Sequence, residues 1–352
     1  MTPISFPREH TQILKGIALL LMLVTHTCTP SYWAESGSTA FILWENLQSA
    51  TKMCVYIFAF LVGYGFFCSQ NKTLRYSAKR IVLLCIPFWA MLFCLFIPSA
   101  YISGKLPEVL GYGSEGGGNL WLLELVYNMF GISESLNWYS WFVCFYILSI
   151  LSLPFLHKFY TKYPRWGWLI SIMGYYVAEC ALHTLPHWDT NPLLHNLFTY
   201  TSIIPLVIVG YQCAVWNSEG RLPHWFEGEK RLPLALATII VVLFIKSADI
   251  PSLGFCLQAF YTPFFVFAVV GIFNSFKLPV LTSALTKVGN LSMYMWFFHA
   301  IFFTKTVNRY SRDLVMEPIH NYFYTFLMTF VLTYIGSWIV KRLLSPVINK
   351  IK

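Results

Sequence analysis

Charged side chains are scarce in this chain. Of its 352 residues only 11% are Asp, Glu, Lys or Arg, whereas 57% are hydrophobic. A water-soluble domain carries a far more polar surface, since roughly a quarter of an average soluble sequence is charged. The composition therefore excludes a soluble globular protein and predicts a chain that crosses a membrane several times.

Acidic residues are the scarcer kind of charge, with 15 against 24 basic residues and a formal net charge of +9. A nucleic-acid-binding surface would gather its basic residues into a patch or stripe with interleaved aromatic residues. Here the basic residues stand at the ends of apolar segments instead. We therefore expect them to contact membrane lipids and expect no nucleic-acid partner.

Metal-ligand spacing is missing from the nine cysteines. We expect neither a metal site nor a serine nucleophile elbow, and we interpret the cysteines of the apolar runs as small core residues. These are Cys54, Cys85, Cys94, Cys144, Cys213 and Cys256. A small-residue cleavage site is missing too, which favours a retained signal-anchor helix for the first apolar run.

Long apolar runs are what the sequence has in quantity, and a bilayer span needs ~20 such residues. The sequence predicts an all-α polytopic membrane protein with about ten transmembrane helices, in a single domain over residues 1–352. The predicted spans are residues 11–30, 48–68, 80–102, 137–157, 166–184, 193–216, 232–247, 254–275, 288–306 and 320–345.

One further apolar run, residues 118–131, is too short to span and contains Glu124. We expect an interfacial or re-entrant helix there, behind the Gly-rich stretch 111–118.

The basic residues also predict how the spans are oriented, because cytoplasmic loops carry an excess of Lys and Arg. With the N-terminus inside and the spans alternating, eighteen of the 24 basic residues lie on the inner side. The other six lie on the outer side: Lys52, Lys105, Lys246, Lys305, Arg309 and Arg312. Both termini are then cytoplasmic. The loops 69–79 and 217–231 are inside, and the segment 103–136 is outside.

The first span carries two ionisable residues, Lys15 and His26. Eleven residues make three helical turns, so both side chains are expected on one helix face, about 16 Å apart along the axis. Lys15 could simply snorkel to the cytoplasmic surface, and His26 could be an interfacial histidine. An ionisable group within a span more often faces a bundle interior, and a neutral imidazole there could act as a general base towards a hydroxyl.

A group of basic residues precedes the third span: Lys72, Arg75, Lys79 and Arg80. It could be ordinary positive-inside topology with contacts to anionic lipids. It could also bind the phosphates of a nucleotide-containing donor, since Lys offers a point charge and Arg a bidentate fork. The pattern alone leaves both interpretations open.

A second histidine, His299, follows Ser292 by seven residues, so the two are expected on one helix face. His299 is either a core histidine bonded to a neighbouring hydroxyl or a residue that supports the chemistry.

Four stretches together resemble a known family. They are 14–18 with His26, 58–64, Trp141-Phe142 with Pro154, and 289–299, which reads Gly-Asn-Leu-Ser-Met-Tyr-Met-Trp-Phe-Phe-His. They are similar to the motifs of the integral-membrane acyltransferase family 3, whose members acylate cell-envelope glycans and other extracytoplasmic acceptors. The sequence departs from the family pattern where Lys15 replaces the usual Arg and Gln12 stands where Asp is common.

The resemblance implies a catalytic His26 and an acyl-CoA donor whose phosphates contact cytoplasmic basic residues. We expect these to be Lys15, Arg75, Lys79 and Arg80, and we expect Ser292, His299 and Trp141 to support the site. The predicted activity is transfer of an acyl group, expected to be acetyl, to a hydroxyl of an extracytoplasmic glycan or lipid-linked sugar. The predicted location is the bacterial plasma membrane.

Two other functions remain open at this point. A transporter or flippase for an envelope precursor would show repeat-related, Gly- or Pro-broken spans around a mid-membrane site. A polymerase or ligase of envelope glycans would be expected to act through a long outer loop rich in Arg or His. The predicted outer segment 103–136 has Lys105 as its one basic residue.

Overall fold

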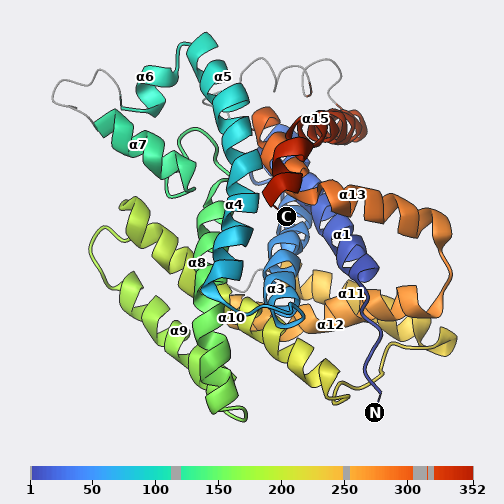
Figure 1. Ribbon diagram of the computed structural model, residues 1–352. Helices are drawn as coiled ribbons and strands as arrows, with labels where there is room; N and C mark the ends of the chain where they lie inside the picture. The colour runs from blue at the N-terminus through green and yellow to red at the C-terminus, as the bar shows by residue number, and fades with distance from the viewer. Residues whose placement is uncertain (1, 112–119, 249–253, 304–314, 316–320, 352) are drawn as a thin grey trace. The chain divides into compact units, whose positions relative to one another are not determined.

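The structure is a computed structural model that describes residues 2–111, 120–248, 254–303, 315 and 321–351, with the side chains of 254–256 left out. All secondary structure in these ranges is helical (Figure 1), as predicted. Most of the predicted Gly-rich stretch, residues 112–118, lies outside the described residues. So do three of the outer basic residues, Lys305, Arg309 and Arg312.

Six helical stretches of the described chain are long and apolar enough to cross a membrane. They are Thr39–Phe67, Leu74–Ile102, Trp141–Lys162, Pro192–Ser218, Leu257–Ser275 and Tyr322–Ile351. The other four predicted spans correspond to the helices α1 (Arg8–Thr27), α9 (Gly167–His183), α11 (Leu232–Ser247) and α13 (Pro279–Phe298). Of these, α9 and α11 have 17 and 16 residues. The count of ten spans therefore stays a prediction.

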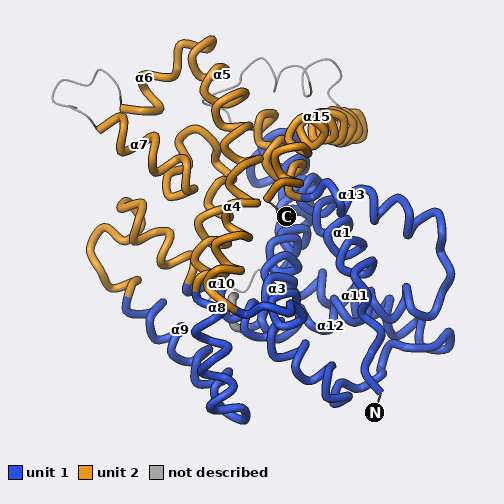
Figure 2. Tube along the Cα trace, viewed as in Figure 1, with its two compact units in different colours: residues 1–72, 152–181, 201–292 blue, residues 73–151, 182–200, 293–352 orange. Residues whose placement is uncertain are grey.

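The chain divides into two compact units, shown in different colours in Figure 2. Unit 1 contains residues 1–72, 152–181 and 201–292, and unit 2 contains residues 73–151, 182–200 and 293–352. Four of the five boundaries fall inside α8 (Trp141–Lys162), α9, α10 (Pro192–Ser218) and α13, and the fifth lies between residues 72 and 73.

Unit 1 is organised around α1, which packs against α2 (Thr39–Thr51), α3 (Met53–Phe67) and α12 (Gly254–Ser275). A short 3-10 turn, η1 (Pro30–Tyr32), follows α1, and another, η3 (Glu229–Arg231), precedes α11. The predicted span 48–68 is interrupted, since α2 ends at Thr51 and α3 begins at Met53 with Lys52 between them.

Glycines bring pairs of unit 1 helices into backbone contact. A Cβ at Gly16 would overlap the main chain of Leu285, and a Cβ at Gly289 would overlap the main chain of Gln12. Close approach through small residues is how helices pack where both are apolar. These two glycines therefore fix how α13 lies against α1.

Unit 2 contains α4 (Leu74–Met91), the π-helical turn η2 (Leu92–Phe96), α5 (Ile97–Ile102), α6 (Leu106–Val109), α7 (Leu120–Met129), η5 (His299–Phe302) and α15 (Tyr322–Ile351). The helix α15 packs on α4. It also carries a row of buried hydroxyl residues spaced four apart: Thr325, Thr329, Thr333 and Ser337. The helix α7 coincides with the run predicted to be interfacial.

The cysteine prediction holds in part. Cys54, Cys85, Cys144 and Cys213 are buried, whereas Cys94 on η2 is exposed. The prediction for Cys94 is therefore wrong. An apolar run that crosses a bilayer has a lipid-facing side as well as a core side, and hydropathy does not separate the two. The Cys256 side chain lies outside the described residues.

Candidate active site

Lys15 and His26 lie on the same unbroken α-helix, α1. Both side chains are half-buried. Eleven residues at 100° each return to within about 20° of the starting direction, so the two side chains share one face of α1. The predicted relation between these two residues therefore holds.

The helical turn that carries His26 is held by side chains from outside α1. Backbone carbonyls at a helix C-terminus have no partner within the helix. Here three consecutive ones accept hydrogen bonds: Thr25 from Gln48 Nε2 (3.1 Å), His26 from Thr29 Oγ1 (3.2 Å) and Thr27 from Trp33 Nε1 (2.6 Å). The backbone around His26 is thus fixed by Gln48 of α2 and by Thr29 and Trp33, which flank η1.

The helix α2 that supplies Gln48 is itself anchored at two points. Thr51 accepts a hydrogen bond from Thr25 Oγ1 at 2.9 Å. On its other side, Ser49 bonds to Lys246 of α11, whose Nζ lies 3.3 Å from Ser49 Oγ and 5.9 Å from the centre of the Tyr56 ring. Lys246 is only 3% exposed. Lys246 is predicted from the sequence only as an outer basic residue, because nothing local indicates its contact with a serine 197 positions away.

The predicted donor contacts of unit 2 lie together in the first turns of α4. Thr73 caps this helix by accepting a hydrogen bond from Tyr76 N at 3.3 Å. Arg75, Lys79 and Arg80 are exposed. Basic side chains near a helix N-terminus oppose the helix dipole, and a bound polyanion would relieve that opposition. Lys15 belongs to unit 1, and these three residues belong to unit 2.

His299 of unit 2 is fully buried in an aromatic surround. Its ring centre lies 5.0 Å from that of Tyr139, 6.2 Å from that of Phe303 and 6.4 Å from that of Trp296. Its Nδ1 lies 3.2 Å from the carbonyl of Met295. His299 begins the turn η5, since α13 ends one residue earlier.

The predicted supporting residue Trp141 belongs to the same part of unit 2 as His299. Its ring centre lies 5.8 Å from that of Phe142, which lies 4.8 Å from that of Trp296. Trp296 in turn donates to the carbonyl of Tyr139 at 3.4 Å. Two of the four sequence motifs thus meet. Ser292, the other predicted supporting residue, is buried on α13 within unit 1.

A polar cluster on α7 orders the segment that leads into Trp141. Glu124 accepts from Ser135 Oγ at 2.7 Å and from Ser133, and Asn128 Nδ2 donates to Ser135 Oγ at 2.8 Å. In this segment, burial raises the pKa of Glu134 to about 7. The sequence alone does not indicate the raised pKa of Glu134, because the burial that causes it comes from the folded segment.

The described residues contain no group of three or more His, Cys, Asp or Glu side chains that could hold a metal ion. The arrangement around His26 instead offers a half-buried imidazole on a fixed backbone.

The comparison with known families identifies the chain. The sequence model of acyltransferase family 3, described as "Acyltransferase domain", matches residues 12–342. The chain belongs to this family. No curated protein and no solved structure gives a significant match. This acyltransferase is also a multi-pass membrane protein, as its six long apolar helices indicate.

The family match begins at Gln12 and therefore includes Lys15, His26 and the α4 basic residues, as well as Trp141, Ser292 and His299.

Proposed function

We propose that this acyltransferase moves an acetyl group from acetyl-CoA, or another acyl group from its CoA thioester, to a hydroxyl of an extracytoplasmic glycan or lipid-linked sugar. The observation that carries the proposal is the pairing of Lys15 with His26 on one face of α1. It supplies a phosphate contact and a proton acceptor about 16 Å apart along one rigid element, a separation comparable to the reach of a pantetheine arm.

In the proposed reaction, His26 accepts the proton of the acceptor hydroxyl as its oxygen attacks the thioester carbonyl carbon. A carbon–oxygen bond forms and the carbon–sulfur bond breaks. The CoA thiolate leaves and recovers the proton from the His26 imidazolium. A positioned base of this kind contributes about 10²–10⁴-fold to the rate. No covalent acyl-enzyme and no metal is required by this scheme.

The donor phosphates are proposed to contact the basic residues predicted to lie at the cytoplasmic membrane level. On unit 1 this residue is Lys15. On unit 2 these are Arg75, Lys79 and Arg80, and the Arg80 guanidinium lies beside the hydroxyls of Tyr76 and Tyr146. Guanidinium groups suit bidentate phosphate binding, and Lys contributes a point charge.

Residues Ser292, His299 and Trp141 are proposed to support the site and not to react. His299 contacts Tyr139 and Trp296, and Trp141 reaches the same aromatic group through Phe142. Close packing among these aromatic side chains holds each of them in a single rotamer. We therefore propose that His299 positions its neighbours and does not react.

The test uses purified protein in lipid vesicles with acyl-CoA labelled in its acyl group and an extracted envelope glycan as acceptor. Label should appear on the glycan as an ester and disappear when the vesicles lack the protein. In cells of the native host, deleting the gene should remove the same ester from envelope glycans, as seen by mass spectrometry. Movement of unmodified glycan across the vesicle membrane without label transfer would instead support the flippase alternative.

A further inference from the structure

A cavity of about 560 Å³ lies within unit 1, and its lining includes neither Lys15 nor His26. It is bounded by α9, α10, α12 and the segment that follows α10. Its walls include Trp168, Val209, Trp216, Trp225 and Phe264. Pockets of this volume hold small molecules or parts of lipids.

The lining of the cavity is almost entirely apolar, with Gln212 and Arg221 as its polar members. A sugar or a nucleotide buried there would leave its own polar groups without partners, which is costly. An alkyl chain has no such groups and gains free energy from every buried methylene. The chemistry of the walls therefore selects a hydrocarbon chain.

The cavity opens at a surface that is itself apolar. Phe260 is 70% exposed and Trp225 is 51% exposed, yet both line the cavity. Trp168 and Trp216 meet edge to face, with ring centres 5.4 Å apart. Tryptophans gather at the membrane–water interface. Because the adjoining segment 217–231 is predicted to be cytoplasmic, the opening corresponds to the inner leaflet.

Arg221 supplies a cation at the rim of this cavity. Its backbone N–H donates to the carbonyl of Trp216 at 2.8 Å, which fixes it at the end of α10. Its Nη1 bonds to Glu219 at 2.9 Å, but both side chains are largely exposed. An exposed ion pair of this kind contributes little to stability. The Arg221 guanidinium also has further N–H groups that can bind a phosphate.

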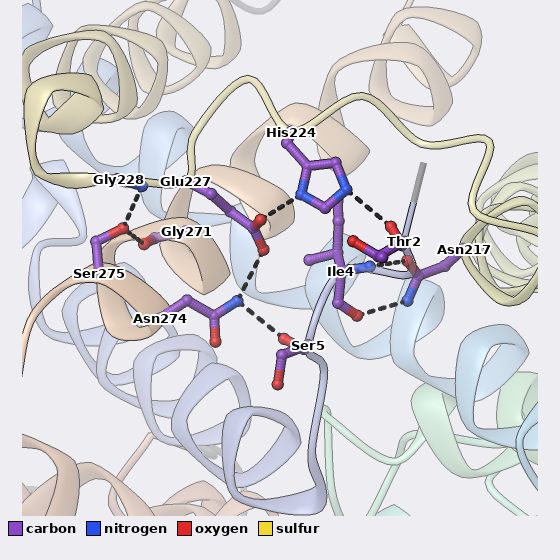
Figure 3. A network of polar contacts seen from close by, with 10 residues as sticks. All are labelled: Thr2, Ile4, Ser5, Asn217, His224, Glu227, Gly228, Gly271, Asn274 and Ser275. Atoms are coloured by element: carbon purple, nitrogen blue, oxygen red, sulfur yellow. Dashed lines mark hydrogen bonds and ion pairs between the residues drawn. The ribbon is translucent and has the colours of Figure 1, made fainter.

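The N-terminal strap, residues 2–6, forms part of the cavity wall through Ile4. Ile4 N donates to Asn217 Oδ1 at 2.8 Å, and Asn217 Nδ2 donates back to the Ile4 carbonyl at 3.0 Å (Figure 3). Asn217 follows Trp216, a cavity residue. The strap leads directly into α1, which begins at Arg8.

We propose that the cavity binds one acyl chain of an anionic phospholipid of the cytoplasmic leaflet, with the lipid phosphate at Arg221. The bound chain packs against Ile4 and so stabilises the strap on unit 1. This lipid site is independent of the acyl-transfer chemistry at His26.

The experiment measures lipid retention by native mass spectrometry on the purified, delipidated full chain. Phosphatidylglycerol and phosphatidylcholine with identical acyl chains are added in parallel. The wild type should retain one phosphatidylglycerol in preference to phosphatidylcholine. Arg221→Gln should bind phosphatidylglycerol about tenfold more weakly, since it loses a charge-assisted contact, and should lose the preference.

Matched controls separate this site from general surface effects. Arg231→Gln removes an exposed basic residue of the same segment outside the cavity lining, so it should keep the preference. Val209→Phe fills the cavity and should abolish retention, whereas Ile240→Phe on an exposed face of α11 should not. Size-exclusion profiles confirm that each variant is folded. Equal effects of the two arginine variants, or full retention by Val209→Phe, would overturn the proposal.

Two further measurements, hydrogen exchange and competition, identify the molecule that occupies the cavity. Hydrogen exchange of the peptide containing Ile4 should slow several-fold when phosphatidylglycerol is added, and this slowing should be lost in Val209→Phe. Competition with palmitoyl-CoA should leave the retained phosphatidylglycerol in place. Displacement by palmitoyl-CoA but not by acetyl-CoA would assign the cavity to the acyl chain of a donor and overturn the phospholipid assignment.

Discussion

Gly289 of α13 lies so close to the main-chain carbonyl of Gln12 on α1 that a Cβ at position 289 would overlap it. The reciprocal contact places Gly16 of α1 against the main chain of Leu285. Both glycines belong to motifs that resemble the family. Gly16 directly follows Lys15, and Gly289 lies three residues before Ser292. Their role is to set the distance between two helix backbones.

We therefore expect Gly289→Ala to destabilise the protein by about 1–3 kcal/mol, the usual cost of forcing an extra carbon into a packed site, and to lower the unfolding temperature measured in detergent. Gly65→Ala is the matched control, because a Cβ at that helical position meets nothing within 4 Å. It should be neutral or slightly stabilising, since Ala favours the helix over Gly. Equal unfolding temperatures for the two variants would contradict the packing argument.

Much of this fold follows from the sequence because it depends on local patterns. All ten predicted spans overlap observed helices, and α7 coincides with the short run around Glu124. Some helix boundaries cannot be predicted from the sequence. The break at Lys52 lies inside the predicted span 48–68, and the neighbouring residues Leu47, Gln48 and Met53 are not turn-forming residues.

The candidate site likewise has features that the sequence predicts and features that depend on tertiary packing. The shared face of Lys15 and His26 is a property of one helix and is predictable from spacing. The hydrogen bonds that fix His26 come from Trp33 and Gln48, which no periodicity connects to α1. The contact between Phe142 and Trp296 likewise joins residues 154 positions apart, so it depends on tertiary packing.

The predicted orientation can be tested at a native residue. Cys68 is an exposed free cysteine next to the loop 69–79. In intact cells it should resist a membrane-impermeant maleimide, and it should react after permeabilisation, because that loop is predicted to be cytoplasmic. Cys68→Ser identifies its signal, and Ser103→Cys in that background should label in intact cells. Labelling of Cys68 without permeabilisation would reverse the orientation.

The proposed donor contacts predict a change in substrate affinity. Arg75→Ala and Arg80→Ala should each raise KM for acyl-CoA about three- to tenfold with kcat nearly unchanged, because they remove phosphate binding that is equal in the ground and transition states. Lys15→Arg should be tolerated. Lys350→Ala, an exposed basic residue near the C-terminus, controls for net charge. A fall in kcat with an unchanged KM would contradict a phosphate role.

The N-terminal strap should respond to pH through His224. Its two ring nitrogens lie beside acceptors, the Glu227 carboxylate and the Thr2 carbonyl, the latter at 2.8 Å (Figure 3). Both nitrogens can donate only in the protonated ring. The hydrogen bond to Glu227, more than the one to Thr2, therefore raises the pKa of His224 above its usual value.

Because the pKa of His224 is raised in the folded state, its hydrogen bonds stabilise the strap fully below the unfolded pKa of about 6.5. This stabilisation is lost as the pH rises through the pKa of the folded state. Hydrogen exchange of the strap amides, corrected for intrinsic rates, should thus be slower at pH 6 than at pH 8.5. His224→Gln should abolish that difference. A pH dependence that persists in His224→Gln would assign it to another group.

The general base is the prediction that decides the proposed mechanism. His26→Ala should reduce acyl transfer by about 10²–10⁴-fold, the usual contribution of a positioned base. His26→Gln preserves much of the volume and a hydrogen-bonding group but cannot accept the proton, so it should be almost as inactive. Both variants should insert into the membrane, since neither adds charge to α1.

Both His26 variants should also bind acyl-CoA with near-normal affinity, because Lys15 lies about three helical turns away. Transfer and binding are therefore measured on the same purified samples, the first with acyl-labelled donor and the second by equilibrium binding. Thr29→Val is an informative companion, since it removes the hydrogen bond to the His26 carbonyl but leaves the imidazole. It should lower kcat by less than His26→Gln does. Near-wild-type transfer by His26→Ala would remove this residue from the chemistry, whereas loss of donor binding in that variant would make it a binding residue.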